Sequence, residues 1–276
     1  MQMYKNLFSK SKWLRKSLFE MAMNQKSGHI PSCFSMVEIL VSLYYGGVAK
    51  IFKDDPKNPN RDYIFVSKGH AAMAQYPILA DYGFFPVSEL QKFTQSDGIL
   101  GLYADFRVPG IEGISGSLGH GVGMGAGIAL DAKNNNKKNK SFVIVGDGEC
   151  YEGSIWESAM FASHHKLDNL VVIVDVNHLC ILGKTEDLLN QGDLGKKWES
   201  FGWHVEYVDG HSYKSLMKGF DAVNNSSGRP VAIIADTVKG KGVSFMEGQA
   251  VWHNRMPEDA LIIKAKADLE FNSITE

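Results

Sequence analysis

The chain has 276 residues, of which 44% are hydrophobic, so it is long and apolar enough for a large folded domain and is not a disordered protein. Its 29 basic and 31 acidic residues give a formal charge of -2, and no lysine or arginine cluster indicates nucleic-acid binding. Three scattered cysteines exclude a disulfide framework, and the short apolar runs predict a cytoplasmic protein with no membrane segment.

The first part of the chain predicts helices around one strand. Apolar residues recur at helical spacing over 6–25, which predicts an amphipathic helix. A second helix is predicted over 34–46, a strand over 63–67, and a third helix beginning near Gly69.

Glycines are closely spaced from Gly110 onward. A flexible linker is one interpretation, but Leu118, Val122 and Ile128 supply an apolar face between the glycines. The pattern therefore favours a loop that opens a closely packed helix.

The second half predicts an alternation of strands and helices. Four more strands are predicted, at 142–145, 170–175, 204–208 and 231–235. This alternation is typical of an α/β protein whose mainly parallel sheet is covered by helices on both faces. Since no linker composition divides the chain, we expect a single domain over 1–276 with a short C-terminal tail.

Gly146, Asp147 and Gly148 follow the strand at 142–145, and Asn177 follows the next one. The carboxyl ends of parallel strands share one edge, where such folds bind ligands. Asp147, the Asn177 amide and a carbonyl in the turn 177–179 would supply the oxygen ligands that magnesium prefers. The two glycines let backbone N–H groups face an anion, so the segment predicts a magnesium-diphosphate site. In the alternative interpretation Asp147 caps a helix and Asn177 lies in a turn.

The stretch "GDGECYEGSIWESAMFASHHKLDNLVVIVDVN" resembles the thiamine diphosphate motif in its transketolase form. Four further segments resemble that family in the same order along nearly the whole chain: "KSGHIPSCFSMVEIL", "RDYIFVSKGHAAMAQYPILA", "GISGSLGHGVGMGAGIAL" and "KGKGVSFME". The resemblance implies the thiamine diphosphate-binding fold.

The resemblance also implies roles for individual residues. Asp147, Asn177 and the Leu179 carbonyl would bind Mg²⁺, or Ca²⁺ or Mn²⁺ in its place. His29 would face the reacting carbon, and Glu152 would join an acidic network that links paired active sites. With Asp147 and Asn177, the implied cofactor-binding residues are His70, Gly116, Ser117, Leu118, Gly119, Gly146, Gly148, Glu149 and His253, of which His70 and His253 are also expected to be catalytic.

The chain stops at Glu276 after the diphosphate-binding domain. In transketolases the glutamate that activates the cofactor lies in a separate pyrimidine-binding domain, so the chain resembles the N-terminal subunit of a split transketolase. The resemblance implies a C-terminal partner subunit, an α2β2 assembly, and transfer of a two-carbon ketol unit from a ketose or ketose phosphate to an aldose. We expect no turnover without the partner.

Two departures from the family concern the sugar donor. No histidine lies between His70 and His120, where Tyr103 is the nearest polar replacement, and Pro31 and Ser32 stand where glycines are common. These changes favour an unusual sugar substrate.

The sequence allows two alternative functions. One is the α subunit of a 2-oxo acid dehydrogenase, against which "WESAMFASHHKLDNL" argues. The other is a non-catalytic scaffold, against which the presence of both Asp147 and Asn177 argues.

Overall fold

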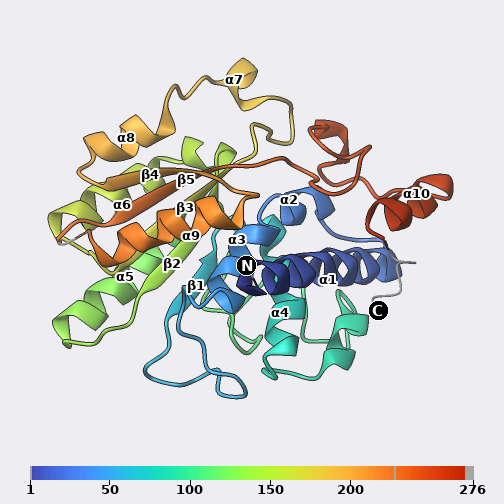
Figure 1. Cartoon of the computed structure of the whole chain (residues 1–276), viewed down its shortest axis with the longest axis horizontal. Helices are drawn as coiled ribbons and strands as arrows, with labels where there is room; N and C mark the ends of the chain where they lie inside the picture. The colour runs from blue at the N-terminus through green and yellow to red at the C-terminus, as the bar shows by residue number, and fades with distance from the viewer. Residues whose placement is uncertain (1, 227, 271–276) are drawn as a thin grey trace.

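The computed structural model describes residues 2–226 and 228–270, which form a sheet between two layers of helices (Figure 1). The five strands are β1 (Tyr63–Val66), β2 (Ser141–Gly146), β3 (Leu170–Val176), β4 (His204–Asp209) and β5 (Val231–Asp236). The α-helices are α1 (Gln2–Gln25), α2 (Ile30–Phe34), α3 (Val37–Tyr45), α4 (Tyr76–Asp81), α5 (Gly121–Asn134), α6 (Gly153–His164), α7 (Thr185–Leu188), α8 (Leu194–Ser200), α9 (Tyr213–Asp221) and α10 (Ala260–Asp268). The 3₁₀ helices are η1 (Gly69–Gln75), η2 (Val87–Lys92), η3 (Gly148–Tyr151), η4 (Ala222–Asn224) and η5 (Ala250–Trp252).

All five strands are parallel, in the order β1-β2-β3-β5-β4. The register pairs Gly146 with Asp175 and Val176 with Asp236, so the carboxyl ends of the central strands reach the same edge. The sequence-predicted parallel sheet is confirmed, and each predicted strand end lies within one residue of the observed end.

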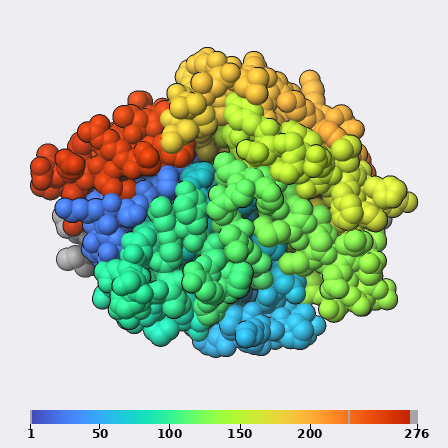
Figure 2. Space-filling view, turned by 180° about the vertical axis from the view of Figure 1, so that it is seen from behind, coloured from blue at the N-terminus to red at the C-terminus, as the bar shows by residue number. Residues whose placement is uncertain are grey.

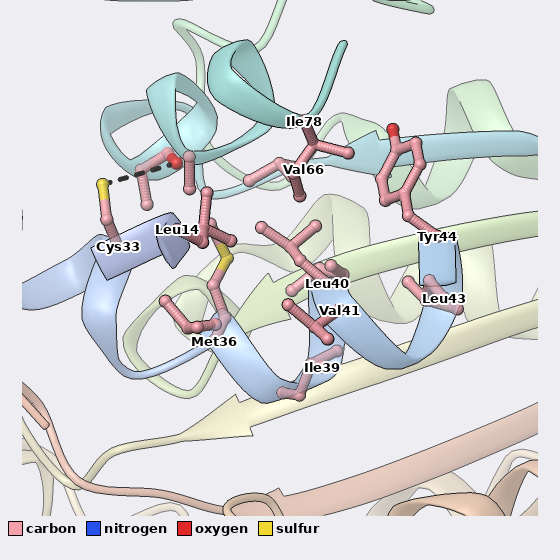
Figure 3. Close-up of a cluster of buried hydrophobic side chains, with 14 of the residues drawn as sticks. Leu14, Cys33, Met36, Ile39, Leu40, Val41, Leu43, Tyr44, Val66 and Ile78 are labelled. Atoms are coloured by element: carbon pink, nitrogen blue, oxygen red, sulfur yellow. Dashed lines mark hydrogen bonds between the residues drawn. The ribbon is translucent and has the colours of Figure 1, made fainter. Parts of the chain in front are cut away.

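The two faces of the sheet pack against different helices. On β2, Phe142 and Ile144 belong to a core with residues of α1 to α4 and α9, whereas Val143 and Val145 belong to a second core with α5, α6 and α8. Figure 3 shows part of the first core, where side chains of α3 pack beside Leu14 and Ile78. The prediction of helices on both faces is therefore confirmed.

Several helices differ from the prediction in detail. The helix predicted over 34–46 is divided, because α2 ends at Phe34 and α3 begins at Val37. The segment from Gly69 begins as the 3₁₀ helix η1 and becomes the α-helix α4, near whose start Pro77 lies. The bounds of α7, α8, α9 and α10 were not predicted.

The glycine-rich segment forms a loop followed by α5, as predicted. A β-carbon on Gly125 would lie 2.5 Å from Val143 Cγ2, so glycine is required for α5 to pack this closely on β2. Of the predicted C-terminal tail, residues 271–276 lie outside the described part of the chain. Within the described part, no helix has the length and apolar character needed to cross a membrane.

Candidate functional site

A cavity of about 170 Å³ lies at the carboxyl edge of the sheet. The segment after β3 (yellow) and the segment after β5 (red) border one another above this edge in Figures 1 and 2. The residues lining the cavity come from segments that follow β1, β2, β3 and β5 and from the glycine loop: Lys68, His70, Leu118, Gly146, Asp147, Gly148, Glu149, Asn177, Leu179, Cys180, Ile181, Lys239 and His253.

Asp147 directly follows β2 and caps the start of η3, and its carboxylate faces the turn that follows β3. One carboxylate oxygen accepts a hydrogen bond from the Gly148 amide at 2.9 Å and the other accepts one from the His178 amide at 2.7 Å. Burial, and then the nearby charge of Asp175, raise the pKa of Asp147 to about 6. The crossover thus brings the end of β2 to the end of β3, as the spacing predicted.

Asn177 and Leu179 lie in the turn after β3 and line the same cavity as Asp147. The Asn177 Oδ1 accepts a hydrogen bond from the Leu179 amide at 3.2 Å, and the Leu179 carbonyl accepts one from the Lys239 ammonium at 3.1 Å. The described residues contain no group of three His, Cys, Asp or Glu side chains able to hold a metal. A site made of one carboxylate, one amide oxygen and one carbonyl instead suits a hard cation that also binds phosphate oxygens.

Three of the predicted histidines lie together. The ring centroid of His29 is 5.4 Å from those of His70 and His253, which are 5.1 Å from each other. Burial, aided by the charge of Lys68, lowers the pKa of His70 to about 2, and burial with the charge of Lys239 lowers the pKa of His253 to about 3. Burial also lowers the pKa of His29, whose Nδ1 is buried and has no hydrogen-bond partner among the described residues. All three rings are therefore neutral near pH 7.

Two buried lysines at the cavity were not predicted. The Lys68 ammonium forms a buried ion pair with Asp175 and donates to the Ser32 carbonyl at 2.8 Å. The Lys239 ammonium lies 2.8 Å from His253 Nδ1, and burial followed by repulsion from Lys68 lowers its pKa to about 8. The Asp175 carboxylate neutralises Lys68, whereas Lys239 contacts a carbonyl and an imidazole, so its charge favours an anionic ligand. The sequence held a signal for both, since each lysine follows soon after the end of a strand, β1 or β5, at the edge where ligands bind.

Glu149 lines the cavity, but its carboxylate bonds to the protein itself. It accepts hydrogen bonds from Ser67 Oγ at 2.5 Å, from the Gly119 amide at 2.8 Å and from the Gly146 amide at 3.1 Å. This buried carboxylate fixes the glycine loop to the ends of β1 and β2. Gly119, with a φ of +83°, has the left-handed conformation that favours glycine.

Some of the predicted site residues are not among the described residues that line the cavity. Of the loop 116–119 only Leu118 lines it, so Gly116, Ser117 and Gly119 do not. Glu152 is exposed and lies beside the glycine loop, where a β-carbon on Gly119 would be 2.6 Å from Glu152 Cβ. Tyr103 has 46% of its surface exposed and is not among the described residues that line the cavity.

The sequence model of a family described as "Transketolase, thiamine diphosphate binding domain" matches residues 12–275. The chain belongs to the transketolase family. This assignment decides against the family of the 2-oxo acid dehydrogenases.

Two of the relatives match this chain over most of their own length. This chain is 39% identical over 260 residues to an apulose-4-phosphate transketolase subunit from Actinobacillus succinogenes, and the match covers 92% of each chain. It is 37% identical over 247 residues to the 6-deoxy-6-sulfo-D-fructose transketolase subunit SqwG of a Clostridium species, covering 88% of each. The transketolase of Campylobacter jejuni superposes with a TM-score of 0.90 at 28% identity, covering 98% of this chain and 43% of that one. The chain thus spans less than half of the longer transketolase and most of the two subunits.

Proposed function

We propose that the chain is the N-terminal subunit of a split transketolase that binds thiamine diphosphate and transfers a two-carbon ketol unit from a ketose or ketose phosphate to an aldose. The observation that carries this proposal is the single cavity shared by Asp147, Asn177 and the Leu179 carbonyl. This set of oxygen ligands beside two ammonium groups fits a divalent cation that carries a diphosphate.

Residues of the cavity have separate roles in this proposal. Asp147, Asn177 and the Leu179 carbonyl hold Mg²⁺, with Ca²⁺ or Mn²⁺ as alternatives, and Lys239 exchanges its bond to Leu179 for one to the diphosphate. When bound, thiamine diphosphate supplies a nucleophilic carbon and an electron sink for cleavage of the sugar. His70 and His253 would donate hydrogen bonds to the diphosphate. Because both rings are neutral near pH 7, they would not repel the metal ion.

His29 contacts the sugar in this proposal. Its Nδ1 is buried and has no partner within the described part of the chain, so this atom lacks a hydrogen bond that a bound substrate hydroxyl would supply. Because burial lowers the pKa of His29, the neutral ring keeps one nitrogen as acceptor and one as donor. It orients the donor hydroxyl or moves a proton at the carbon that reacts.

The carboxylate that activates the cofactor comes from a partner chain. The family carries it in a separate pyrimidine-binding domain, and two relatives that match this chain along most of their length are named as subunits. We expect an α2β2 assembly in which the cofactor lies between the two kinds of chain and Glu152 links the paired sites. The exposed position of Glu152 beside the glycine loop supports such a contact.

The donor is a ketose that differs from the common pentose phosphates. Two relatives are named for apulose-4-phosphate and for 6-deoxy-6-sulfo-D-fructose, which supports a donor other than a common pentose phosphate. In this chain Pro31 lies near the start of α2, and the Ser32 hydroxyl is buried without a partner among the described residues. These residues shape the wall beside His29.

Calorimetric titration with thiamine diphosphate and Mg²⁺ tests the proposal, first on the chain alone and then with its partner. We expect weak binding by the chain, tighter binding by the complex, and ketol transfer from a ketose phosphate only by the complex. No binding in either sample would favour the scaffold, and release of CO₂ from pyruvate without ketol transfer would favour decarboxylation chemistry.

A further inference from the structure

A buried ion pair lies behind the turn that carries Lys239. Arg15 of α1 and Glu38 of α3 form two parallel hydrogen bonds, of 2.6 Å from Nη1 to Oε1 and 2.8 Å from Nη2 to Oε2. Burial opposes the charge on Glu38, but the Arg15 charge and a hydrogen bond from His211 hold its pKa at about 2. The pair therefore stays ionised at neutral pH, and only 9% of each side chain is exposed.

His211 connects this ion pair to the turn. Its Nδ1 lies 2.9 Å from Glu38 Oε2, and its Nε2 accepts a hydrogen bond from the Val238 amide at 2.9 Å. Because Nε2 is an acceptor, the ring proton is on Nδ1 and is donated to Glu38. Both ring nitrogens are thus used, and His211 is fixed in one tautomer.

A second contact reaches the other side of Lys239. Arg15 Nε donates to the Lys241 carbonyl at 2.9 Å, while His211 holds the Val238 amide. Between them Gly240, with a φ of +82°, donates to the Pro31 carbonyl at 2.9 Å. The backbone on both sides of Lys239 is therefore held by groups anchored in α1, α2 and α3.

A second cavity, of about 230 Å³, lies behind the turn, and Arg15, Glu38 and His211 are among the residues that line it. A β-carbon on Gly242 would lie 3.1 Å from Arg15 Cδ, so the guanidinium side chain packs directly on the turn. Arg15, Glu38 and His211 are not among the described residues lining the cofactor cavity, so they reach it only through the turn. Lys239 itself crosses from this turn into the cavity, where its ammonium contacts Leu179 and His253.

We propose that Arg15, Glu38 and His211 are positioning residues that hold the Lys239 ammonium where it meets the diphosphate. This inference rests on the proposed function and adds to it a set of buried residues outside the cavity. A fixed ammonium loses less conformational entropy when the ligand binds than a mobile one does. Loss of the network should therefore weaken cofactor binding without removing any group that touches the cofactor.

The test compares variants of the full chain by their dissociation constant for thiamine diphosphate in excess Mg²⁺. His211→Leu and Arg15→Lys should each raise the constant about 10-fold, which corresponds to about 1.4 kcal/mol. His211→Gln offers one donor and one acceptor and should restore most of the affinity. His204→Leu is the matched control, since His204 begins the same strand that His211 follows and pairs with Glu206 at 2.9 Å, away from the turn.

A double-mutant cycle separates positioning from general destabilisation. In a Lys239→Met background, His211→Leu should have no further effect on the dissociation constant, because the network acts through Lys239. An equal effect in both backgrounds, or wild-type affinity in both His211→Leu and Arg15→Lys, would overturn the inference.

Hydrogen exchange of the ligand-free chain gives a second readout. Amides of 238–242 should exchange faster in His211→Leu than in the wild type or in His204→Leu. Unchanged exchange would refute the positioning role even if the wild type bound the cofactor well. Absence of cofactor binding by the wild type, alone and with its partner, would instead refute the proposed function, while the exchange experiment would still decide whether the network fixes the turn.

Discussion

The Lys239 ammonium lies 3.1 Å from the Leu179 carbonyl oxygen, one of the three oxygens expected to bind the metal. A positive group thus already contacts an atom that suits a cation. The same ammonium is 2.8 Å from His253 Nδ1, so one side chain joins the segment after β5 to the turn after β3 and to the histidine cluster. In the proposed function, this lysine exchanges the Leu179 carbonyl for the diphosphate when the ligand binds.

Substitution of Asp147 should abolish metal-dependent binding. In Asp147→Asn the amide keeps the size of the side chain but removes the charge, so the affinity for thiamine diphosphate with Mg²⁺ should fall by more than about 100-fold. Asp236→Asn is the control, because Asp236 also ends a strand at this edge but is exposed. Titration calorimetry of the two variants checks this, and equal affinities would contradict the assigned ligand.

The affinity for Mg²⁺ with thiamine diphosphate should depend on pH through Asp147. The metal binds the ionised carboxylate, and burial raises the pKa of that group to about 6 in the ligand-free chain. Below pH 6 a proton must leave before the metal binds, so affinity should fall up to about tenfold for each further pH unit. Titrations between pH 5 and pH 8 measure this slope, and an affinity independent of pH would show that Asp147 does not hold the metal.

Lys239 should contribute to affinity through its charge. Lys239→Met removes the ammonium and should raise the dissociation constant about 10- to 100-fold, as expected for a hydrogen bond to a charged group. Lys241→Met offers a close comparison, since Lys241 lies two residues further on and pairs with Glu247 in a partly exposed bridge at 3.6 Å. A loss of affinity as large in Lys241→Met would point to general weakening of the segment.

Glu149 should stabilise the glycine loop at 116–119 more than it contributes to cofactor affinity. Glu149→Gln replaces an acceptor of three hydrogen bonds with a group that accepts at one atom only, which should destabilise the chain by about 1–3 kcal/mol. Denaturant unfolding measures the loss, and hydrogen exchange at Gly119 and Gly121 should rise with it. Glu152→Gln, on the exposed start of α6, should leave both unchanged.

The sheet, and the position of Asp147 and Asn177 at one cavity, were predictable because they depend on local sequence. The run 170–174 is continuously apolar and rich in β-branched residues, which is typical of a strand buried on both faces. Asp147 and Asn177 follow such strands, so parallel pairing alone brings them to one edge.

The buried lysines were not predicted, because a charged side chain is buried only where tertiary contacts pair it. Lys68 depends on Asp175, which is distant in sequence, and Lys239 depends on a turn held by Arg15 and His211. The division of the second predicted helix into α2 and α3 also depends on packing, because Ser35, between them, bonds to Asp175 at 2.6 Å.

A diffraction experiment on crystals of the chain with Mn²⁺ and thiamine diphosphate tests the central claim most directly, because the anomalous signal locates the metal. We expect one peak about 2.1 Å from an Asp147 carboxylate oxygen, Asn177 Oδ1 and the Leu179 carbonyl oxygen, with the remaining ligands from diphosphate and water. A metal bound to other residues, or a diphosphate outside the cavity that contains Asp147, would contradict the account.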